Sequence, residues 1–396
     1  MRKQRMWAAF IVLVVLGGIV GATASASSNA KSAAPIKLGI VDTFSGSLAG
    51  LGTDHLKGAQ VAVSEINASG GLLGRKVTIE TQDDQATSQV ALQALRQMHN
   101  DGIHLLVAGG TSSAVCLDEM ALLSQLQELQ ISPGCSLQTL TGSALVPNFF
   151  RTSENVNATV AATVEGVCKN FPNITRVDTL ELDVASAATG VGLAGGLFAK
   201  CEGAKVVNRV KVPSTATDFL SYLTNLNTHL ASDSAQHSAL YVWVFGAPEI
   251  TAFKEGVELG LFNKYKVVFS NVNDIQQVAN ALGSSMPPVY ATLYYYSTAW
   301  NTPLNQQFVK DYTKKFGTAP DSSNGEAFNA VMAYAAAITK AKSDNYLKVR
   351  AALEGLTFKT LQGHMKINAN SHQGDVTEAI TLFSSSPPRV VTTIHP

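Results

Sequence analysis

The sequence alternates between short apolar runs and amphipathic stretches with helical spacing, beginning at Ile36. The run 36–41 has the length and composition of a buried strand, and apolar residues then recur every three or four positions across 56–66, as one face of a helix requires. Glycines at 70–71 end that helix, and a further strand is expected at 77–81. This alternation predicts an α/β fold with parallel sheets covered by helices on both faces.

The same pattern restarts after Arg151, with a helical stripe over 156–167 and apolar strand candidates up to 266–269. These are too many strand–helix units for one compact sheet, so we expect two doubly wound parallel-sheet lobes. The last part of the chain differs, because a β-rich run at 289–296 precedes three helical stretches. We expect these helices to return to the first lobe and the chain to cross between the lobes several times.

The expected boundaries follow from this pattern. Lobe 1 is predicted to comprise 36–152 plus 286–358, and lobe 2 to comprise 153–285 plus 359–396. The two lobes would be joined by a hinge made of several crossovers.

The N-terminus has the three regions of a secretory signal peptide. Cations at 2, 3 and 5 precede an apolar run over 7–20, and Ala24-Ser25-Ala26 matches an A-x-A cleavage site. We expect a signal peptide at 1–26 and a flexible tether at 27–35, with an uncleaved N-terminal anchor as the alternative. The first cysteine is Cys116, so a lipid anchor on a new N-terminal cysteine is not expected. The mature protein is therefore predicted to lie in the periplasm or at the outer face of the cell envelope.

Composition excludes several classes of function. Cleavage after Ala26 would leave 370 residues (396 minus 26) and a net charge of about −3 (26 cations minus 29 acids), with no basic excess to attract nucleic acid. The sequence has no P-loop, GxSxG elbow or HExxH motif. We expect no catalytic residues, no cofactor, no metal site and no nucleic-acid partner.

Four cysteines, an even number, suggest disulfides in an exported protein. The preferred pairing joins sequence neighbours, Cys116 with Cys135 and Cys168 with Cys201, and four buried free thiols are the alternative. No CxxC pair or nearby histidine suggests zinc.

A series of sequence blocks carries a family resemblance. In chain order the blocks are IKLGIVDTFSGSLAGLG (36–52), GAQVAVSEINASGGLLGRKV (58–77), VAGGTSSAV (107–115), ISPGCSLQTLT (131–141), FFRTSE (149–154), TDFLSYLTNL (217–226) and GAPEITAFKEGVELGL (246–261). In this order, the chain resembles the leucine/isoleucine/valine-binding group of periplasmic solute-binding proteins, which have the type I fold. The resemblance implies a monomeric receptor that closes its lobes on a small molecule by a hinge and delivers it to the permease of an ABC importer.

The sequence is also compatible with two other functions. One is a ligand-sensing receptor that acts with a separate signalling partner. The other is an enzyme built on the same fold, for which the sequence offers no nucleophile–base or metal set.

Two loops after strands are the candidate ligand anchors. In open α/β sheets a ligand sits beyond the carboxyl ends of the strands, and amides at a helix start attract an anion. The resemblance places Ser113 on a ligand carboxylate, and Gly134 and Ser136 on both the carboxylate and the ammonium group. Ser112 adds a donor beside Ser113, and Cys135 lies within the second loop. Serines that only cap helices are the alternative.

The second lobe departs from the family pattern. Val272 stands at about the place of the family's acidic residue, and Asp274 would replace that acid only if the loop shifts. Gly246, preceded by Phe245, stands where the family has a tyrosine, and Leu51 stands where it has an aromatic residue. Tyr295 is expected either to stack on the ligand or to fill a strand core. We therefore expect a ligand with a carboxylate, amide or other acceptor end and a less charged remainder, drawn from amino acids, amides and small carboxylates.

Overall fold

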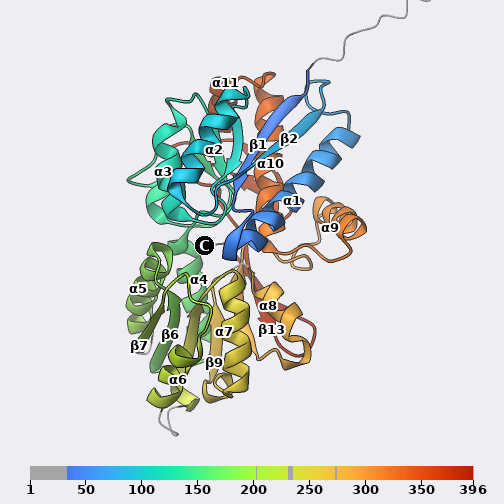
Figure 1. Ribbon diagram of the computed structural model, residues 1–396. Helices are drawn as coiled ribbons and strands as arrows, with labels where there is room; N and C mark the ends of the chain where they lie inside the picture. Colours follow the sequence, from blue (N-terminus) through green and yellow to red (C-terminus); the bar gives the residue numbers. More distant parts are fainter. Residues whose placement is uncertain (1–33, 202, 231–234, 273, 396) are drawn as a thin grey trace, which may run out of the picture. The chain divides into compact units, whose positions relative to one another are not determined.

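The computed structural model describes residues 34–201, 203–230, 235–272 and 274–395 (Figure 1). The predicted signal peptide and all but the last two residues of the predicted tether lie outside the described residues. The described chain is α/β, as predicted, and contains two large sheets and one small one. None of the helices in this part of the chain combines the length and the apolar character that crossing a membrane requires.

The first sheet has five strands in the order β2-β1-β3-β4-β5, and every pair is parallel. Its strands are β1 (Ile36–Asp42), β2 (Val77–Asp83), β3 (Leu105–Ala108), β4 (Leu129–Ser132) and β5 (Phe149–Arg151). The helices that connect them are α1 (Ala49–Ala68), α2 (Ser88–Asn100) and α3 (Ser113–Leu123). The buried side chains of β1 and β3 are divided between the core clusters on the two faces of the sheet, because successive side chains along a strand point to opposite faces.

The second sheet has seven strands in the order β14-β13-β10-β9-β8-β6-β7. Its parallel strands are β6 (Arg176–Leu182), β7 (Lys205–Val212), β8 (Ser238–Trp243), β9 (Val267–Ser270) and β10 (Val289–Leu293). Two antiparallel strands, β13 (Glu378–Phe383) and β14 (Arg389–Ile394), extend it beyond β10. Its helices are α4 (Val156–Asn170), α5 (Ala185–Lys200), α6 (Leu220–His229), α7 (Ala247–Glu258) and α8 (Ile275–Leu282).

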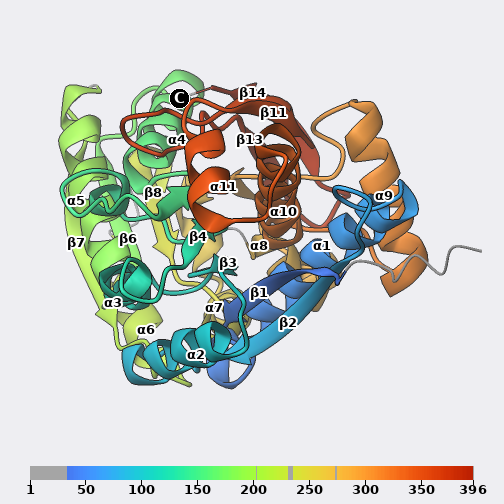
Figure 2. The same cartoon turned by 90° about the horizontal axis from the view of Figure 1, so that it is seen from above.

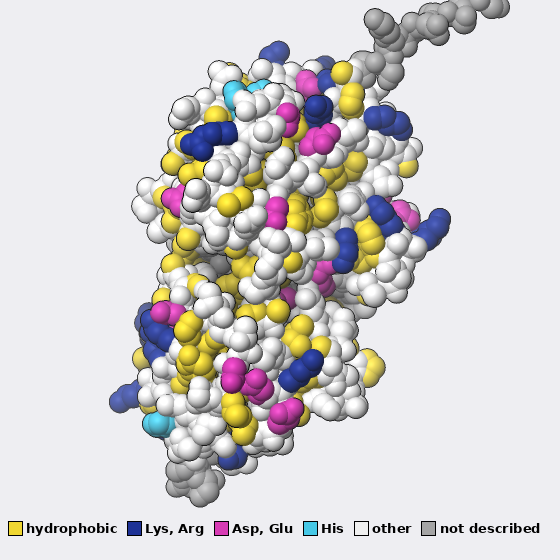
Figure 3. Space-filling model, viewed as in Figure 1, with side chains coloured by type: hydrophobic (Ala, Val, Ile, Leu, Met, Phe, Trp, Pro, Cys, Tyr) yellow, Lys and Arg dark blue, Asp and Glu magenta, His cyan; other side chains and the backbone are white. Residues whose placement is uncertain are grey.

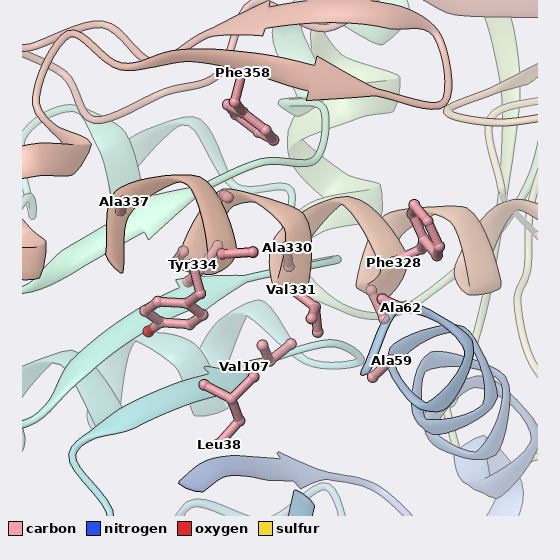
Figure 4. Packing of buried hydrophobic residues seen from close by; sticks show 14 of the residues in the cluster. Leu38, Ala59, Ala62, Val107, Phe328, Ala330, Val331, Tyr334, Ala337 and Phe358 are labelled. Carbon is pink, nitrogen blue, oxygen red and sulfur yellow. The ribbon is translucent and has the colours of Figure 1, made fainter. Parts of the chain in front are cut away.

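The late helices return to the first sheet. They are α9 (Pro303–Phe316), α10 (Ser322–Ala341) and α11 (Tyr346–Leu353), followed by the hairpin β11 (Thr357–Thr360) and β12 (Gly363–Lys366). The two views show α10 beside α1 (Figures 1 and 2). Figure 4 shows Val331 and Tyr334 of α10 on the side of the helix that faces Leu38 of β1 and Val107 of β3. The Tyr334 hydroxyl donates to a backbone carbonyl of β3 or β4, with Leu129 O at 2.6 Å, so α10 is fixed to the centre of this sheet.

Helices cover both faces of the first sheet, as the prediction required. One core cluster combines the sheet with α1, α10 and α11, and a second combines it with α2 and α3. On the face of the molecule drawn in Figure 3, basic and acidic side chains are interspersed among uncharged ones.

The strand pairing departs from the predicted lobe boundaries at two places. β10 belongs to the second sheet, although 286–358 was assigned to lobe 1. The hairpin β11–β12 and the following Ile367 and Val376 pack in the core of the first sheet, although 359–396 was assigned to lobe 2. We propose instead that the chain crosses between the lobes after β5, after β10 and before β13.

Candidate functional site

A cavity of about 530 Å³ lies at the carboxyl ends of the parallel strands of both sheets. On the first sheet its wall is formed by residues that follow β1 to β5: Thr43, Gln85, Ser112, Ser136 and Glu154. On the second sheet it is formed by residues that end or follow β6 to β9: Val184, Thr215, Phe245 and Asn271. This is the edge at which ligands bind in open α/β sheets.

The loop between β3 and α3 forms one side of this cavity. Ser112 is the N-cap of α3, and its Oγ accepts a hydrogen bond from the Val115 amide at 3.4 Å. Ser112, Ser113 and Ala114 all line the cavity. The first amides of a helix have no partner within the helix and lie at the positive end of its dipole. The start of α3 therefore offers donors to an anion or to another acceptor group.

The loop after β4 lies against the first loop. A Cβ at Gly134 would stand 2.2 Å from the Gly110 carbonyl oxygen, so only glycine allows the two backbones to approach this closely. The Leu137 amide donates to the Ser113 Oγ at 3.3 Å, so that hydroxyl is already an acceptor within the protein. Gly134 and Ser136 line the cavity beside Ser113.

Buried His55 and Glu326 form the floor of the cavity on the side of the first sheet, and His55 also contacts the buried Asp42. The His55 Nδ1 lies 2.8 Å from Asp42 Oδ2, and its Nε2 lies 3.0 Å from Glu326 Oε2. Burial lowers the pKa of His55, but the charge of Asp42 and the hydrogen bonds to both carboxylates outweigh it and raise that pKa to about 10. Burial and the nearby Glu154 raise the pKa of Glu326 well above its ordinary value.

The second sheet contributes aromatic and apolar groups. Trp243 and Phe245 line the cavity, and the Trp243 ring occupies the space where Gly190 lacks a side chain, with ring atoms 2.2 Å from a Cβ built there. Val272 also lines the cavity, at the place where the sequence lacks the family's acid. An aromatic wall thus faces the polar anchor loops of the first sheet.

Asp274 lies at the cavity, but its carboxylate is engaged by its own lobe. Its Oδ2 accepts a hydrogen bond from the Gly246 amide. Burial raises the pKa of Asp274 to about 6, and burial together with the charge of Asp274 raises the pKa of Glu249 well above its ordinary value. This pair therefore holds a proton to higher pH than two isolated carboxyl groups would, and the larger shift falls on Glu249.

The charge of the lining is distinctive. Among the described residues around the cavity, none is lysine or arginine, whereas Glu154, Asp274 and Glu326 are acidic and His55 is the one titratable base. An anionic ligand would therefore depend on backbone amides and hydroxyls for its recognition, because both ring nitrogens of His55 already contact Asp42 and Glu326.

The structure brings seven of the nine predicted ligand-binding residues to this cavity: Leu51, Ser112, Ser113, Gly134, Ser136, Phe245 and Asp274. Contact between these residues and a ligand stays a prediction. Tyr295 lies elsewhere, because its ring stacks near Trp300 and its hydroxyl donates to Asn305 Oδ1 at 2.6 Å in the core. The Cys135 side chain is 1% exposed and does not line the cavity, because its sulfur is bonded to Cys116.

The two disulfides have the predicted connectivity, Cys116 with Cys135 and Cys168 with Cys201. The alternative of free thiols is therefore wrong. The described residues contain no group of three or more histidine, cysteine, aspartate or glutamate side chains placed to hold a metal ion.

Several cavity residues were missed by the sequence analysis. Glu154 is the last residue of the FFRTSE block, and an acidic residue in the segment that follows a short strand was a signal for it. Trp243 ends the apolar strand β8, and nothing in the local sequence distinguishes it from a core residue. His55 and Glu326 are 271 positions apart, and no local pattern connects them.

Comparison with known proteins places this geometry in a family. A family model described as periplasmic binding protein matches residues 35–384. The Leu/Ile/Val-binding protein homolog 8 of Brucella suis biovar 1 (strain 1330) is 25% identical over 324 residues, which cover 78% of this chain and 77% of the relative.

Two solved structures have the same fold. The amino acid ABC transporter substrate-binding protein from Pseudomonas fluorescens Pf-5 superposes with a TM-score of 0.80 at 20% identity, covering 91% of this chain and 96% of the other. A solute-binding protein of an ABC transporter from R. palustris, solved in complex with benzoate, superposes with a TM-score of 0.81 at 18% identity, covering 91% of this chain and 97% of the other.

Proposed function

This chain belongs to the periplasmic binding protein family, and from that premise we propose that it captures a small solute outside the cytoplasmic membrane and delivers it to the permease of an ABC importer. The observation that carries the proposal is the cavity of about 530 Å³, whose walls come from the carboxyl ends of both sheets. A ligand in this position contacts both sheets, so its binding favours the closed arrangement of the lobes. The protein acts as a monomer and releases its ligand unchanged.

The ligand class follows from the lining. The start of α3 and the hydroxyls of Ser112 and Ser136 suit a carboxylate, an amide or another acceptor end. Trp243, Phe245 and Leu51 suit an apolar or aromatic body. Because acidic side chains line the cavity and lysine and arginine do not, a ligand with several negative charges is disfavoured. Amino acids, amides and small monocarboxylates fit these conditions.

The test is native mass spectrometry of the purified protein, followed by thermal unfolding with a panel of amino acids, amides and monocarboxylates. We expect one compound to be retained or to raise the melting temperature, and the same compound to be recovered unchanged after long incubation. Uptake of that labelled compound by cells that lack the protein, with and without a plasmid copy, separates an importer component from a sensor. Correctly folded protein that responds to no member of the panel would contradict the proposal.

A further inference from the structure

A covalent bond joins the two loops that carry the predicted anchor residues. Cys116 lies in the first turn of α3, three residues after Ser113, and Cys135 lies between Gly134 and Ser136. Their Cα atoms are 6.6 Å apart, and their side chains are 0% and 1% exposed. The bond is therefore buried beside the residues that line the cavity and does not line the cavity itself.

These loops also contact each other through hydrogen bonds and through the core cluster that contains Leu137 and Leu140. The Gly109 carbonyl accepts from the Cys135 amide at 3.1 Å and from the Ser132 Oγ at 2.7 Å. The Ser113 Oγ accepts from the Leu137 amide at 3.3 Å. Glycines form the facing parts of both loops, so no large side chains interlock there. The disulfide is thus the strongest restraint on the separation of the two loops.

The Cys116 sulfur also packs against Gly109, the residue that begins the first anchor loop. Gly109 has φ +71°, and a Cβ there would stand 2.1 Å from the Cys116 sulfur. The sulfur therefore occupies the space beside the loop that leads to Ser112 and Ser113. Loss of the bond frees this sulfur to rotate and removes the support behind the loop.

We propose that the Cys116–Cys135 disulfide is a positioning element of the ligand site, which holds the two anchor loops at the separation that lets one acceptor group bind donors from both. The proposal rests on the proposed function. A recognition site keeps its strength only when its groups are held within about 0.5 Å of the productive geometry. Loss of one hydrogen bond to a charged ligand group weakens binding roughly tenfold or more, and we expect this effect when the bond is absent.

If the disulfide strengthens ligand binding, ligand binding must in turn stabilise the disulfide. If the oxidised protein binds a ligand more tightly than the reduced protein, the ligand makes the disulfide harder to reduce by the same factor. In the reduction, dithiothreitol gives two electrons and two protons to the S–S bond, two thiols form at Cys116 and Cys135, and dithiothreitol becomes its cyclic disulfide. A tenfold difference in affinity lowers the reduction potential by about 30 mV.

The second disulfide is a matched control within the chain. Cys168 lies in α4 and Cys201 directly follows α5, both beside the second sheet. Neither residue lines the cavity. Removing this bond relaxes a loop of comparable length, so it lowers the stability of the fold without changing the anchor loops.

The experiment compares Cys116→Ser/Cys135→Ser with Cys168→Ser/Cys201→Ser. Binding of L-leucine and of benzoate, two monocarboxylates, is measured by calorimetry, and amide hydrogen exchange is measured without ligand. We expect the first variant to show a Kd roughly tenfold higher and faster exchange at 109–116 and 132–137. The second variant should keep the Kd and the exchange of those segments. Dithiothreitol titration of the folded second variant, with and without the bound carboxylate, gives the potential shift even if the first variant fails to fold.

The outcomes separate this inference from the proposed function. Equal Kd values in wild type and both variants, or equal losses in both variants, overturn the positioning role. If neither carboxylate binds the wild type, the proposed ligand class fails for these two probes, and hydrogen exchange still decides the positioning role. Unchanged exchange at 109–116 and 132–137 in the first variant, or unchanged exchange there after reduction, then overturns it.

Discussion

The His55 imidazole lies directly behind Gly110, so that a Cβ on Gly110 would stand 2.5 Å from the His55 Nδ1. The same Cβ would stand 2.2 Å from the Asp42 Oδ2. The loop before α3 therefore packs against the buried pair of His55 and Asp42. The space between them is too small for one methyl group. The floor of the cavity and its first anchor loop form a single packed unit, and disturbing either should affect the other.

Gly110→Ala should both destabilise the protein and weaken ligand binding. The added methyl group has to displace the loop or break the contact between His55 and Asp42, and overpacking of this kind typically costs about 1–3 kcal/mol. Urea unfolding and calorimetry measure the two effects. Gly196→Ala is the control, because a Cβ there meets nothing within 4 Å and helix α5 should gain slightly from alanine. Wild-type stability in Gly110→Ala would contradict the packing described above.

His55 should make the stability depend on pH in the alkaline range. Its pKa rises from an ordinary value of 6.5 to about 10 in the folded protein, so the folded state binds its proton more tightly. This contribution is fully present below about pH 6.5 and is lost as the pH rises through about 10. Its size is on the order of a few kcal/mol.

The variant His55→Gln tests this dependence. The amide keeps the polarity and approximate size of the side chain but does not titrate. Urea unfolding at about pH 6, about pH 8 and about pH 10 should show a falling free energy of unfolding for the wild type and a shallower fall for the variant. Identical slopes would show that the imidazole of His55 is not charged in the folded protein.

Much of the fold could be predicted from the sequence, because its information is local. The strand candidate 36–41 and the helical stripe 56–66 became β1 and α1, and the late helices became α9 to α11. The crossovers were harder to place. β10 carries the same apolar pattern as a strand of either sheet, and only its pairing with β9 and β13 decides its lobe.

The residues of the candidate site also fall into those that local sequence predicts and those that it does not. Ser112, Ser113, Gly134 and Ser136 follow strands of the first sheet, so the rule on strand ends found them. Tyr295 was predicted from its aromatic character, but the following chain turns its hydroxyl toward Asn305 in the core. The contact of His55 with Glu326 depends on the packing of α10 against α1, which no local pattern in the sequence encodes.

Trp243 should report ligand binding by its fluorescence. The side chain lines the cavity, whereas Trp300 does not. A bound ligand changes the polarity around the indole, so the emission should shift or change intensity. Trp243→Phe should abolish this change, and Trp300→Phe, the control, should keep it. A signal that survives in Trp243→Phe and disappears in Trp300→Phe would place the ligand outside this cavity.

Glu128→Gln should stabilise the protein above neutral pH. Glu128 is 0% exposed, and neither of its carboxylate oxygens has a hydrogen-bond partner among the described residues. Burial raises its pKa from 4.5 to about 8, because a desolvated carboxylate is costly. Between these two values the folded state binds more protons than the unfolded state, so this group lowers the stability progressively as the pH rises toward 8.

The glutamine variant keeps the shape of the side chain and removes the charge. Its free energy of unfolding should match that of the wild type near about pH 4 and exceed it above about pH 8 by an amount on the order of a few kcal/mol. Glu80→Gln, an exposed position on β2, is the control and should change little at either pH. Because the charged form of Glu128 is the costly one, an equal gain at both pH values would assign the effect to packing and would contradict the electrostatic origin argued here.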